Sequence, residues 1–427
     1  MSYASVFVLW MVLLAWPSWA WPAQIIRGPI LQNYANVASE AELRIWTDMA
    51  IRACVDYGPS PLLTMQICDS NPVTDHRLRL TGLTPGAPHS YRIVSDGAVL
   101  ESPADFEALR SPGDAGERSY VIIADFRWPQ AGTLAHLARM ATLNPKAVLT
   151  AGDNGYYLLD SQSDFDARLM RPFRELWKRA WAFVGAGNHD NSTIFKGIFP
   201  SIYRITDGDL TIIHLTSWGG LARDIQTIER LRQWLAEPAR WRVIIHHHPA
   251  FVCGYPGEET YAAAIRAAWV PIYEAAGVDL VISGHEHLYA RSGPKNGVTY
   301  VITGGGSDGL SPVYETCKAS YTVGRKVSQF GWLHVEGDTL EWRAIGATGE
   351  ILDAVQLIKG SEPPAAPTIV FRHELGWTTE RAARCILNGQ AVPTSGQQQV
   401  PPGSHRLLCE GPGGQTSRTT TIGEAEP

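Results

Sequence analysis

Carboxylate, amide and imidazole side chains close five separate apolar runs of this sequence. The runs are YVIIAD, AVLTAGD, AFVGAGNHD, RVIIHHH and VISGHEH, and their ends carry Asp125, Asp153, Asn188 with His189, the triplet His246, His247 and His248, and His285 with His287. Nitrogen and oxygen donors without thiolates suit Zn, Fe or Mn. Because these donors exceed the ligands of one tetrahedral site, the pattern implies two ions. Two ions about 3.5–4 Å apart can clamp a phosphoryl group.

The five runs are nearly continuous apolar segments, which is typical of strands covered on both faces. Segments with helical i, i+3, i+4 apolar spacing separate them, namely TLAHLARMATL, DFDARLMRPFRELWKRA, DIQTIERLRQWLAEP and ETYAAAIRAAWVPIYEAAG. This alternation predicts a layered α/β domain with parallel strands at about 118–357. The later strand-like segments of that domain predict a second sheet packed on the first. Ligands of such sheets bind at the carboxyl edge, so we expect the five run ends to meet at one rim.

Two β-rich regions flank the predicted α/β domain. Short alternating segments with turn residues predict a β-sandwich over 25–108, similar to fibronectin type III domains. The segments RSPGDAGERS and KGSEPPAAP are typical of linkers. Residues 366–427 are rich in short strands, Gly and Pro, and predict a small β-rich module.

Composition limits the class of protein and its partners. The chain has 427 residues, of which 45% are hydrophobic and 18% charged, as expected of a globular chain of several domains. A net charge of −6 without a basic patch disfavours nucleic-acid binding.

The first twenty residues, MSYASVFVLWMVLLAWPSWA, hold an apolar run that is short for a membrane span and ends in small residues. We therefore predict a signal peptide over 1–20, with an uncleaved anchor as the alternative. The predicted protein is secreted or periplasmic and has no stable membrane span.

Six cysteines in an exported chain favour disulfides. Six cysteines allow fifteen pairings. Pairing of sequence neighbours gives one bridge per predicted domain: Cys54–Cys68, Cys253–Cys317 and Cys385–Cys409. Free buried thiols are the alternative.

The motifs GDNGY, GNHD, HHP and GHEH, in this order, resemble those of the calcineurin-like metallophosphoesterases. The GD-x-x-Y spacing of Asp153 and Tyr156, together with the N-terminal segment RGPILQNY, resembles the purple acid phosphatases. The resemblance covers about residues 25–357. It implies a two-sheet α/β/β/α metallophosphoesterase sandwich.

The resemblance also implies how the ligands divide between two metal ions. The first ion, Fe(III), would be held by Asp125, Asp153, Tyr156 and His287. The second, Zn, Fe(II) or Mn, would be held by Asn188, His247 and His285, with Asp153 bridging both ions. Tyr157 is the alternative phenolate.

The histidine triplet allows more than one assignment. Successive strand side chains point to opposite faces, so His246 and His248 share a face and His247 points the other way. The His-x-Pro pattern of the family, followed by an aromatic residue, favours His247 as the ligand. His246 stays open as an alternative ligand, and His248 is assigned to the pocket near the substrate.

The implied reaction is hydrolysis of a small phosphate monoester. A metal-bound hydroxide would attack phosphorus, and His189 would protonate the leaving group. Asp190 and His248 join His189 as candidate catalytic residues. A phosphodiesterase on the same dinuclear core is one alternative, and a surface binding protein with little or no turnover is another.

Arg127 departs from the family pattern. Purple acid phosphatases have Gly at this position and other relatives have a His ligand. A guanidinium cannot bind a cation, but it suits a phosphate oxygen. Arg127 is therefore a candidate catalytic residue that grips phosphate, or else it faces solvent or a carboxylate.

Overall fold

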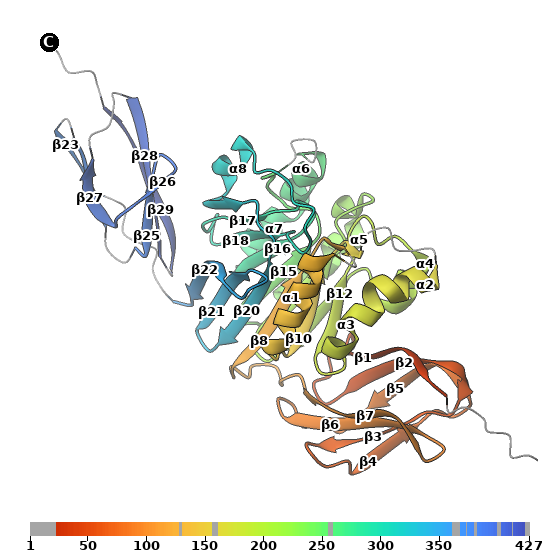
Figure 1. Cartoon of the computed structure of the whole chain (residues 1–427). Coiled ribbons are helices and arrows are strands. Elements are labelled where there is room, and N and C mark those ends of the chain that lie inside the picture. The colour runs from red at the N-terminus through yellow and green to blue at the C-terminus, as the bar shows by residue number, and fades with distance from the viewer. Residues whose placement is uncertain are drawn as a thin grey trace, which may run out of the picture.

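The structure is a computed structural model, which describes residues 23–127, 130–155, 161–254, 259–360, 368–372, 374–379, 382–398, 403–411 and 413–422. In chain order it shows a β-sandwich, a larger α/β domain and a β-rich C-terminal module (Figure 1). The predicted signal peptide lies outside the described residues. No helix of the described ranges is long and apolar enough to cross a membrane.

Two mixed sheets form the α/β domain. In the first, β8 (Arg118–Ile123), β10 (Ala147–Ala151) and β12 (Trp181–Gly185) run parallel, and β20 (Phe330–Glu336), β21 (Thr339–Ile345) and β22 (Ile351–Ile358) extend it antiparallel. The second sheet has the order β13 (Tyr203–Asp207), β14 (Leu210–Leu215), β15 (Trp241–His246), β16 (Leu280–Ser283), β18 (Thr299–Thr303), β17 (Tyr289–Arg291) and β19 (Val323–Arg325). A second sheet is present, as predicted, but of the two later segments that predicted it only 298–306 belongs to it, as β18, whereas 329–346 forms β20 and β21, which extend the first sheet.

The buried side chains of these strands alternate between two cores. Tyr120 and Ile122 of β8 share a cluster with Val243 and Ile245 of β15, which places this cluster between the two sheets. The intervening Val121 packs on the opposite face of its sheet. Helices α1 (Ala131–Thr142) and α3 (Arg171–Trp177) cover that outer face, while α5 (Ile225–Ala236), α6 (Glu259–Ala268) and α7 (Val270–Ala275) cover the second sheet. The layers are therefore helix, sheet, sheet, helix.

Two of the predicted helices are interrupted. The segment predicted over 164–180 begins as α2 (Gln162–Phe165), widens into a π-helical turn (η1, Asp166–Met170) and continues as α3. The segment 259–277 divides between α6 and α7, where Pro271 removes a backbone donor. The remaining short helices are α4 (Thr193–Ile198), η2 (Leu221–Arg223) and α8 (Glu315–Ser320).

The N-terminal sandwich shares a sheet with the α/β domain. Its strands β1 (Ile25–Gln32), β2 (Ala41–Ile51) and β5 (Val73–Leu80) face a second sheet of β4 (Met65–Cys68), β3 (Cys54–Pro59), β6 (Pro88–Ser95) and β7 (Ala98–Glu107). Leu31 of β1 pairs in parallel with Trp181 of β12, so one nine-stranded sheet runs through both parts (Figure 1). The sequence motifs, which divide the chain into a separate sandwich and an α/β domain, do not predict that the two share a sheet.

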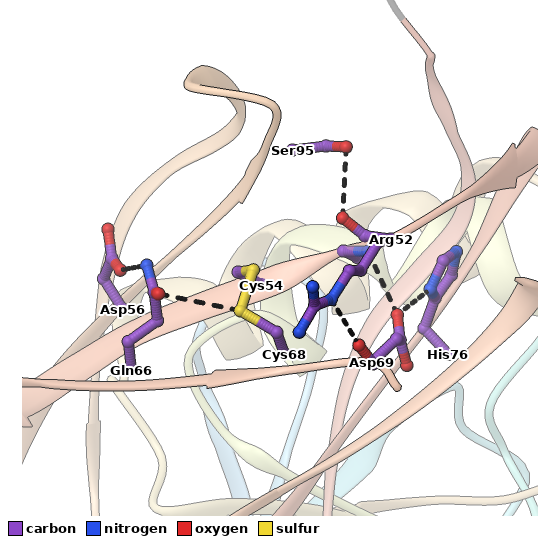
Figure 2. The surroundings of a disulfide bond; sticks show 9 residues. Arg52, Cys54, Asp56, Gln66, Cys68, Asp69, His76 and Ser95 are labelled. Atoms are coloured by element: carbon purple, nitrogen blue, oxygen red, sulfur yellow. Dashed lines mark hydrogen bonds and ion pairs between the residues drawn. A yellow bond between two sulfur atoms is a disulfide. The ribbon is translucent and has the colours of Figure 1, made fainter. Parts of the chain in front are cut away.

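Three disulfides join sequence neighbours, as predicted. Cys54 and Cys68 lie opposite each other on β3 and β4, and the carboxylate of Asp69 nearby contacts His76 Nδ1 at 2.6 Å (Figure 2). Cys385 and Cys409 join β25 (Arg384–Leu387) to β28 (Gly403–Gly411). The C-terminal module also contains β23 (Thr368–Arg372), β24 (Glu374–Thr378), β26 (Gln390–Val392), β27 (Ser395–Gln398) and β29 (Gly414–Ile422).

Candidate metal centre

The polar strand ends meet at one edge of the two sheets. Asp125 and Asp153 each follow a parallel strand by two residues, and the register of β8, β10 and β12 keeps these ends level. In the facing sheet, His247 follows β15 by one residue and His285 follows β16 by two. The sheet edge therefore gathers ligands from segments up to 160 residues apart.

Asp125, Asp153 and His247 form the centre of this group. One ligand atom of each lies within 4.8 Å of the others, and all three side chains are buried. His247 Nε2 is 3.3 Å from Asp153 Oδ1 and 4.0 Å from Asp125 Oδ1. His287 Nε2 is 3.6 Å from Asp125 Oδ1, and His285 Nδ1 is 3.3 Å from His247 Nε2. These five side chains converge on one small volume.

Several buried oxygens of the candidate ligands find no hydrogen-bond donor among the described residues. They are Asp125 Oδ1, Asp153 Oδ2 and Asn188 Oδ1. Buried carboxylate and amide oxygens are almost always paired, because leaving one unpaired costs about 1–3 kcal/mol or more. Cations satisfy such oxygens, and their donor chemistry suits hard or borderline divalent and trivalent metals. The residues present fit a metal centre.

Electrostatics points to the same need for positive charge. Burial raises the pKa of Asp125 well above its usual range, and the nearby Asp153 carboxylate raises it further. Burial would lower the pKa of His247, but the Asp153 and Asp125 carboxylates raise it to about 10. Without a metal, a proton on His247 therefore supplies part of the balancing charge. Metal ions would displace that proton.

Three candidate ligands have left-handed backbone conformations. The φ angles are 57° at Asp125, 54° at Asp153 and 70° at His285. Non-glycine residues rarely adopt such angles, and they cluster at sites where the surrounding structure enforces them. Backbone hydrogen bonds hold two of these turns together: Asp125 N–H donates to Gly152 O, and His285 N–H donates to Asp125 Oδ2 at 2.7 Å.

Glycines allow the ligand loops to approach one another. A Cβ atom on Gly187 would collide with the carboxylate of Asp153, and a Cβ on Gly284 would crowd Asp125 Oδ2. Gly187 of the GN motif and Gly284 of the GH motif are thus needed because a larger side chain would not fit, and not because their φ angles are positive. Their role was not assigned from the sequence, although their places beside Asn188 and His285 are a usable signal.

Hydrogen bonds orient two of the imidazoles. His247 Nδ1 donates to Ala151 O at 2.9 Å, and His287 Nδ1 donates to Gly309 O at 2.8 Å. Each ring therefore presents Nε2 to the aspartates, which is the arrangement that metal-binding histidines commonly have.

The three consecutive histidines have different surroundings. His247 lies beside the aspartates, whereas His246 points into the helix-side core and stacks on Tyr273, with ring centroids 6.2 Å apart. Burial lowers the pKa of His246 to about 4. His248 is also buried, but its ring lies 4.2 Å from that of His285. Alternation separates the first two and no longer applies at the third, because β15 ends at His246.

His248 supports a neighbouring imidazole. Its backbone N–H donates to Ser217 Oγ, and its Nδ1 lies 3.0 Å from the same oxygen. Tyr261 stacks on its other side at 4.3 Å. The residue is 1% exposed, so it packs behind His285 rather than lining an open pocket. No motif identified Ser217 in advance.

His189 and Asp190 are adjacent but have different environments. The side chain of His189 is 34% exposed, and its Nε2 lies 3.9 Å from Asp153 Oδ2. Asp190 is buried, and it accepts hydrogen bonds from the backbone of Gly187 and from the backbone and side chain of Asn154. Asp190 therefore holds together the two loops that carry Asn154 and Gly187. Its buried position does not suit the contact with substrate that the sequence predicts for it.

Arg127 lies at the rim beside His287. It belongs to β9 (Phe126–Arg127), which pairs with β11 (Asn154–Gly155), and it is half-buried. Its guanidinium would be 3.0 Å from a Cβ on Gly309, the residue whose carbonyl holds His287. Burial lowers the pKa of His287, and the charge of Arg127 adds to this effect. Tyr156 and Tyr157 lie outside the described residues.

Comparison with known proteins agrees with this geometry. Residues 119–289 match the family model of the calcineurin-like phosphoesterases. An uncharacterised protein of Mycobacterium tuberculosis is 27% identical over 290 residues, which cover 55% of this chain and 52% of that protein. Purple acid phosphatase 18 of Arabidopsis thaliana is 25% identical over 233 residues, or 50% and 47% of the two chains. The chain thus spans about half the length of the curated relatives it matches.

Two solved structures share the fold over a larger part of the chain. A purple acid phosphatase isolated from yellow lupin (Lupinus luteus) seeds superposes with a TM-score of 0.67 and 14% identity, covering 78% of this chain and 74% of that one. The structure of PhoD superposes with a TM-score of 0.61 and 9% identity, covering 94% and 93%. At these identities the likeness concerns the fold alone.

Proposed function

We propose that this chain, which carries a calcineurin-like phosphoesterase domain over residues 119–289, is a metal-dependent hydrolase of phosphate monoesters. The observation that carries the proposal is the buried group of Asp125, Asp153 and His247, with two carboxylate oxygens that no described donor satisfies. A protein that only bound a partner through this edge would gain nothing from burying two unpaired carboxylates.

The proposed centre would hold two metal ions, and Asp153 would contribute to both ligand sets. Asp125, His287 and Tyr156 would complete the first ligand set, and Asn188, His247 and His285 the second. We propose Fe(III) for the first ion, because a phenolate from Tyr156 suits it, and Zn, Fe(II) or Mn for the second. When bound, such ions neutralise the charge of a phosphate and acidify a water that serves as the nucleophile.

The protein's own side chains divide the remaining tasks. His189 reaches the open side of the centre, and we assign it the proton that Nε2 delivers to the leaving oxygen. Arg127 lies beside Gly309, the residue that holds His287, and we assign its guanidinium to a non-bridging phosphate oxygen. His248 and Asp190 hold other residues in place and touch neither the substrate nor the leaving group.

The domain arrangement and location belong to the same proposal. We propose a fibronectin type III-like sandwich over 25–108, a catalytic domain over 118–357 and a β-rich module over 366–427. The three-stranded and four-stranded facing sheets of the N-terminal part support the first of these. Three disulfides support residence in an oxidising compartment, in line with a secreted or periplasmic protein.

Metal analysis combined with hydrolysis assays tests the proposal. Purified, oxidised protein should contain two metal ions per chain, absorb visible light through the Tyr156 phenolate, and hydrolyse 4-nitrophenyl phosphate faster than bis(4-nitrophenyl) phosphate. Colourless protein with two Zn or Mn ions would retain the hydrolase and remove the Fe(III) assignment. Faster hydrolysis of the diester would favour a phosphodiesterase, and metal-loaded protein that cleaves neither ester would contradict the proposal.

A further inference from the structure

We propose that Glu286 is a positioning residue, which anchors the loop of residues 284–288 to the disulfide between Cys253 and Cys317. This loop carries two histidines of the proposed metal centre, so the inference rests on the proposed function. The disulfide and the carboxylate would together set where those histidines stand. Neither group contacts the metals or the substrate in this account.

The carboxylate of Glu286 contacts the backbone of Cys253, one of the two cysteines of the disulfide. Glu286 lies in sequence between His285, whose ring contacts His247, and His287, which faces Asp125, and it is only 3% exposed. Its Oε2 accepts the backbone N–H of Cys253 at 2.8 Å. A Cβ on Gly254 would be 3.3 Å from the carboxyl carbon of Glu286, so the side chain fits closely against this turn. A buried carboxylate at this point has a definite structural partner.

The loop itself has little regular structure to hold it. Glu286 N–H donates to Gly284 O, and Leu288 N–H donates to Glu286 O at 2.6 Å, which makes a pair of tight turns. His285 within these turns has φ of 70°. A strained loop of this kind keeps its shape only where outside contacts fix it. The contact from Glu286 to Cys253 is one of these.

The disulfide joins the segment that follows β15 to α8. Cys253 ends the segment that begins with His247, and Cys317 lies in α8. Tyr314 N–H donates to Cys253 O at 3.1 Å, and Tyr321 OH donates to Phe251 O at 2.6 Å. These bonds tie the segment after β15 to both ends of α8.

The chain that leads into α8 also reaches a histidine of the centre. Gly309 O accepts from His287 Nδ1, and Ser311 N–H donates to His287 O, both at 2.8 Å. The segment from 309 to 317 thus runs from His287 to the disulfide. Glu286 adds a second, direct connection between the same two places. The segment that begins with His247 and the loop that carries His285 and His287 are thus held by one buried cluster.

Small displacements of metal ligands have large effects, and loss of an orienting contact typically weakens metal affinity about 10–100-fold. We therefore test Glu286→Ala, Glu286→Gln and the double variant Cys253→Ser/Cys317→Ser. Zn²⁺ affinity is measured by competition with a chromophoric chelator, and kcat and KM for 4-nitrophenyl phosphate are measured separately. Glu286→Ala should bind Zn²⁺ about 10–100-fold more weakly. Glu286→Gln should stay within about threefold, because its amide oxygen still accepts the Cys253 N–H.

The disulfide variant should bind Zn²⁺ about 10-fold more weakly, at the low end of the same range. The matched control is Cys54→Ser/Cys68→Ser, which removes a disulfide of the N-terminal sandwich (Figure 2). This control should lower Tm and leave Zn²⁺ affinity unchanged. Equal losses of affinity in both disulfide variants would mean that general destabilisation is the cause, and would overturn the inference.

A second measurement does not depend on metal binding. In metal-free protein, amide hydrogen exchange over residues 284–288 should be faster in Glu286→Ala than in Glu286→Gln or the wild type. If the wild type binds no metal but exchange behaves as stated, the proposed function fails and the positioning role stands. If the wild type binds two ions and Glu286→Ala matches it in affinity and exchange, the inference is wrong. Should Glu286→Ala not fold, the disulfide variants decide.

Discussion

The exposed imidazole of His189 and the bracing carboxylate of Asp190 show how adjacent residues in one motif take different tasks. His189 faces the open side of the centre, and Asp190 holds the backbone of Gly187 and Asn154. Burial and the nearby Asp153 carboxylate raise the pKa of Asp190 to about 7. The sequence motif GNHD marks the place of both residues but contains nothing that separates their roles.

A proton-donating His189 predicts a leaving-group effect. The substitution His189→Ala should lower kcat about 10²–10⁴-fold for an alkyl phosphate, because an alkoxide needs a proton to leave. The loss should be much smaller for 4-nitrophenyl phosphate, whose leaving group is stable without one. Steady-state kinetics with the two substrates measures the ratio, and metal content should match the wild type. Equal losses on both substrates would rule out the proton-donor role.

Arg127 makes a prediction about phosphate affinity. Replacing it by Met removes a charge-assisted hydrogen bond to a phosphate oxygen, worth about 1.5–3 kcal/mol. KM for the ester and the inhibition constant for inorganic phosphate should each rise about 10-fold or more, since about 1.4 kcal/mol corresponds to a factor of ten. Inhibition by phosphate is the cleaner measurement. An unchanged inhibition constant would place the guanidinium away from the substrate.

At the residue scale, the sequence predicts which strand ends carry ligands but not the orientation of every side chain. His246 and His247 follow strand alternation, and the structure places only His247 beside the aspartates. His248 does not follow it, because the strand has already ended. Its support of His285 depends on Ser217 and Tyr261, which come from segments that no local pattern connects to the triplet.

At the scale of elements, the loops after the parallel strands are held close together by their glycines. A Cβ on Gly187 would collide with Asp153, whereas a Cβ on Gly197 in nearby α4 would meet nothing within 4 Å. This difference in space leads to opposite predictions for the same substitution at two positions ten residues apart.

Gly187→Ala should abolish two-metal binding or reduce it severely, because Asp153 must move to make room. Gly197→Ala should leave metal binding intact and stabilise the protein by up to about 1 kcal/mol, since Ala is the better residue inside a helix. Metal content by elemental analysis and thermal unfolding of both variants provide the comparison. Normal metal content in Gly187→Ala would show that the loop spacing is less restrictive than the structure implies.

The types of the helices and strands were largely predictable from the sequence, but the places where a helix is interrupted or distorted were not. Continuous apolar runs predict the strands that are buried on both faces. Apolar residues at helical spacing predict the helices that cover a sheet with one face. The π-helical turn at Asp166–Met170 has no such pattern. Its Asp166 pairs with Arg27 of β1 through a bidentate contact, so the distortion lies where the N-terminal sandwich meets the α/β domain.

At the scale of the whole molecule, buried charges join the parts at the edge opposite the metal centre. Asp207 of β13 accepts hydrogen bonds from Lys146 Nζ at 2.9 Å, Tyr120 OH at 2.5 Å and the backbone N–H of Arg110 at 2.7 Å. Two donors belong to the first sheet, because Tyr120 lies in β8 and Lys146 directly precedes β10, and the third lies in the segment after β7. Asp207 therefore links the N-terminal sandwich to the α/β domain.

Asp207→Ala should destabilise the protein by about 3–5 kcal/mol, because it leaves the charge of Lys146 buried without this partner. Asp224→Ala, which removes the N-cap of α5, should cost only about 1 kcal/mol and serves as the control. Urea unfolding of the metal-free proteins measures both free energies. A loss at Asp207 no larger than that at Asp224 would show that the linking network contributes little.

Whole-molecule organisation was the least predictable level. The β1–β12 pairing merges a predicted separate sandwich into the central sheet, and it rests on a contact between Leu31 and Trp181. Such long-range pairing leaves no local pattern, because each strand alone has the composition of any half-buried strand. Disulfides were predictable only because each joins neighbours in sequence.

An anomalous-scattering map of metal-loaded crystals tests the central claim most directly. We expect two peaks, each within about 2.0–2.2 Å of a carboxylate oxygen of Asp153, with Asp125 on one peak and His247 on the other. A single peak, or two peaks of which one does not touch Asp153, would contradict it.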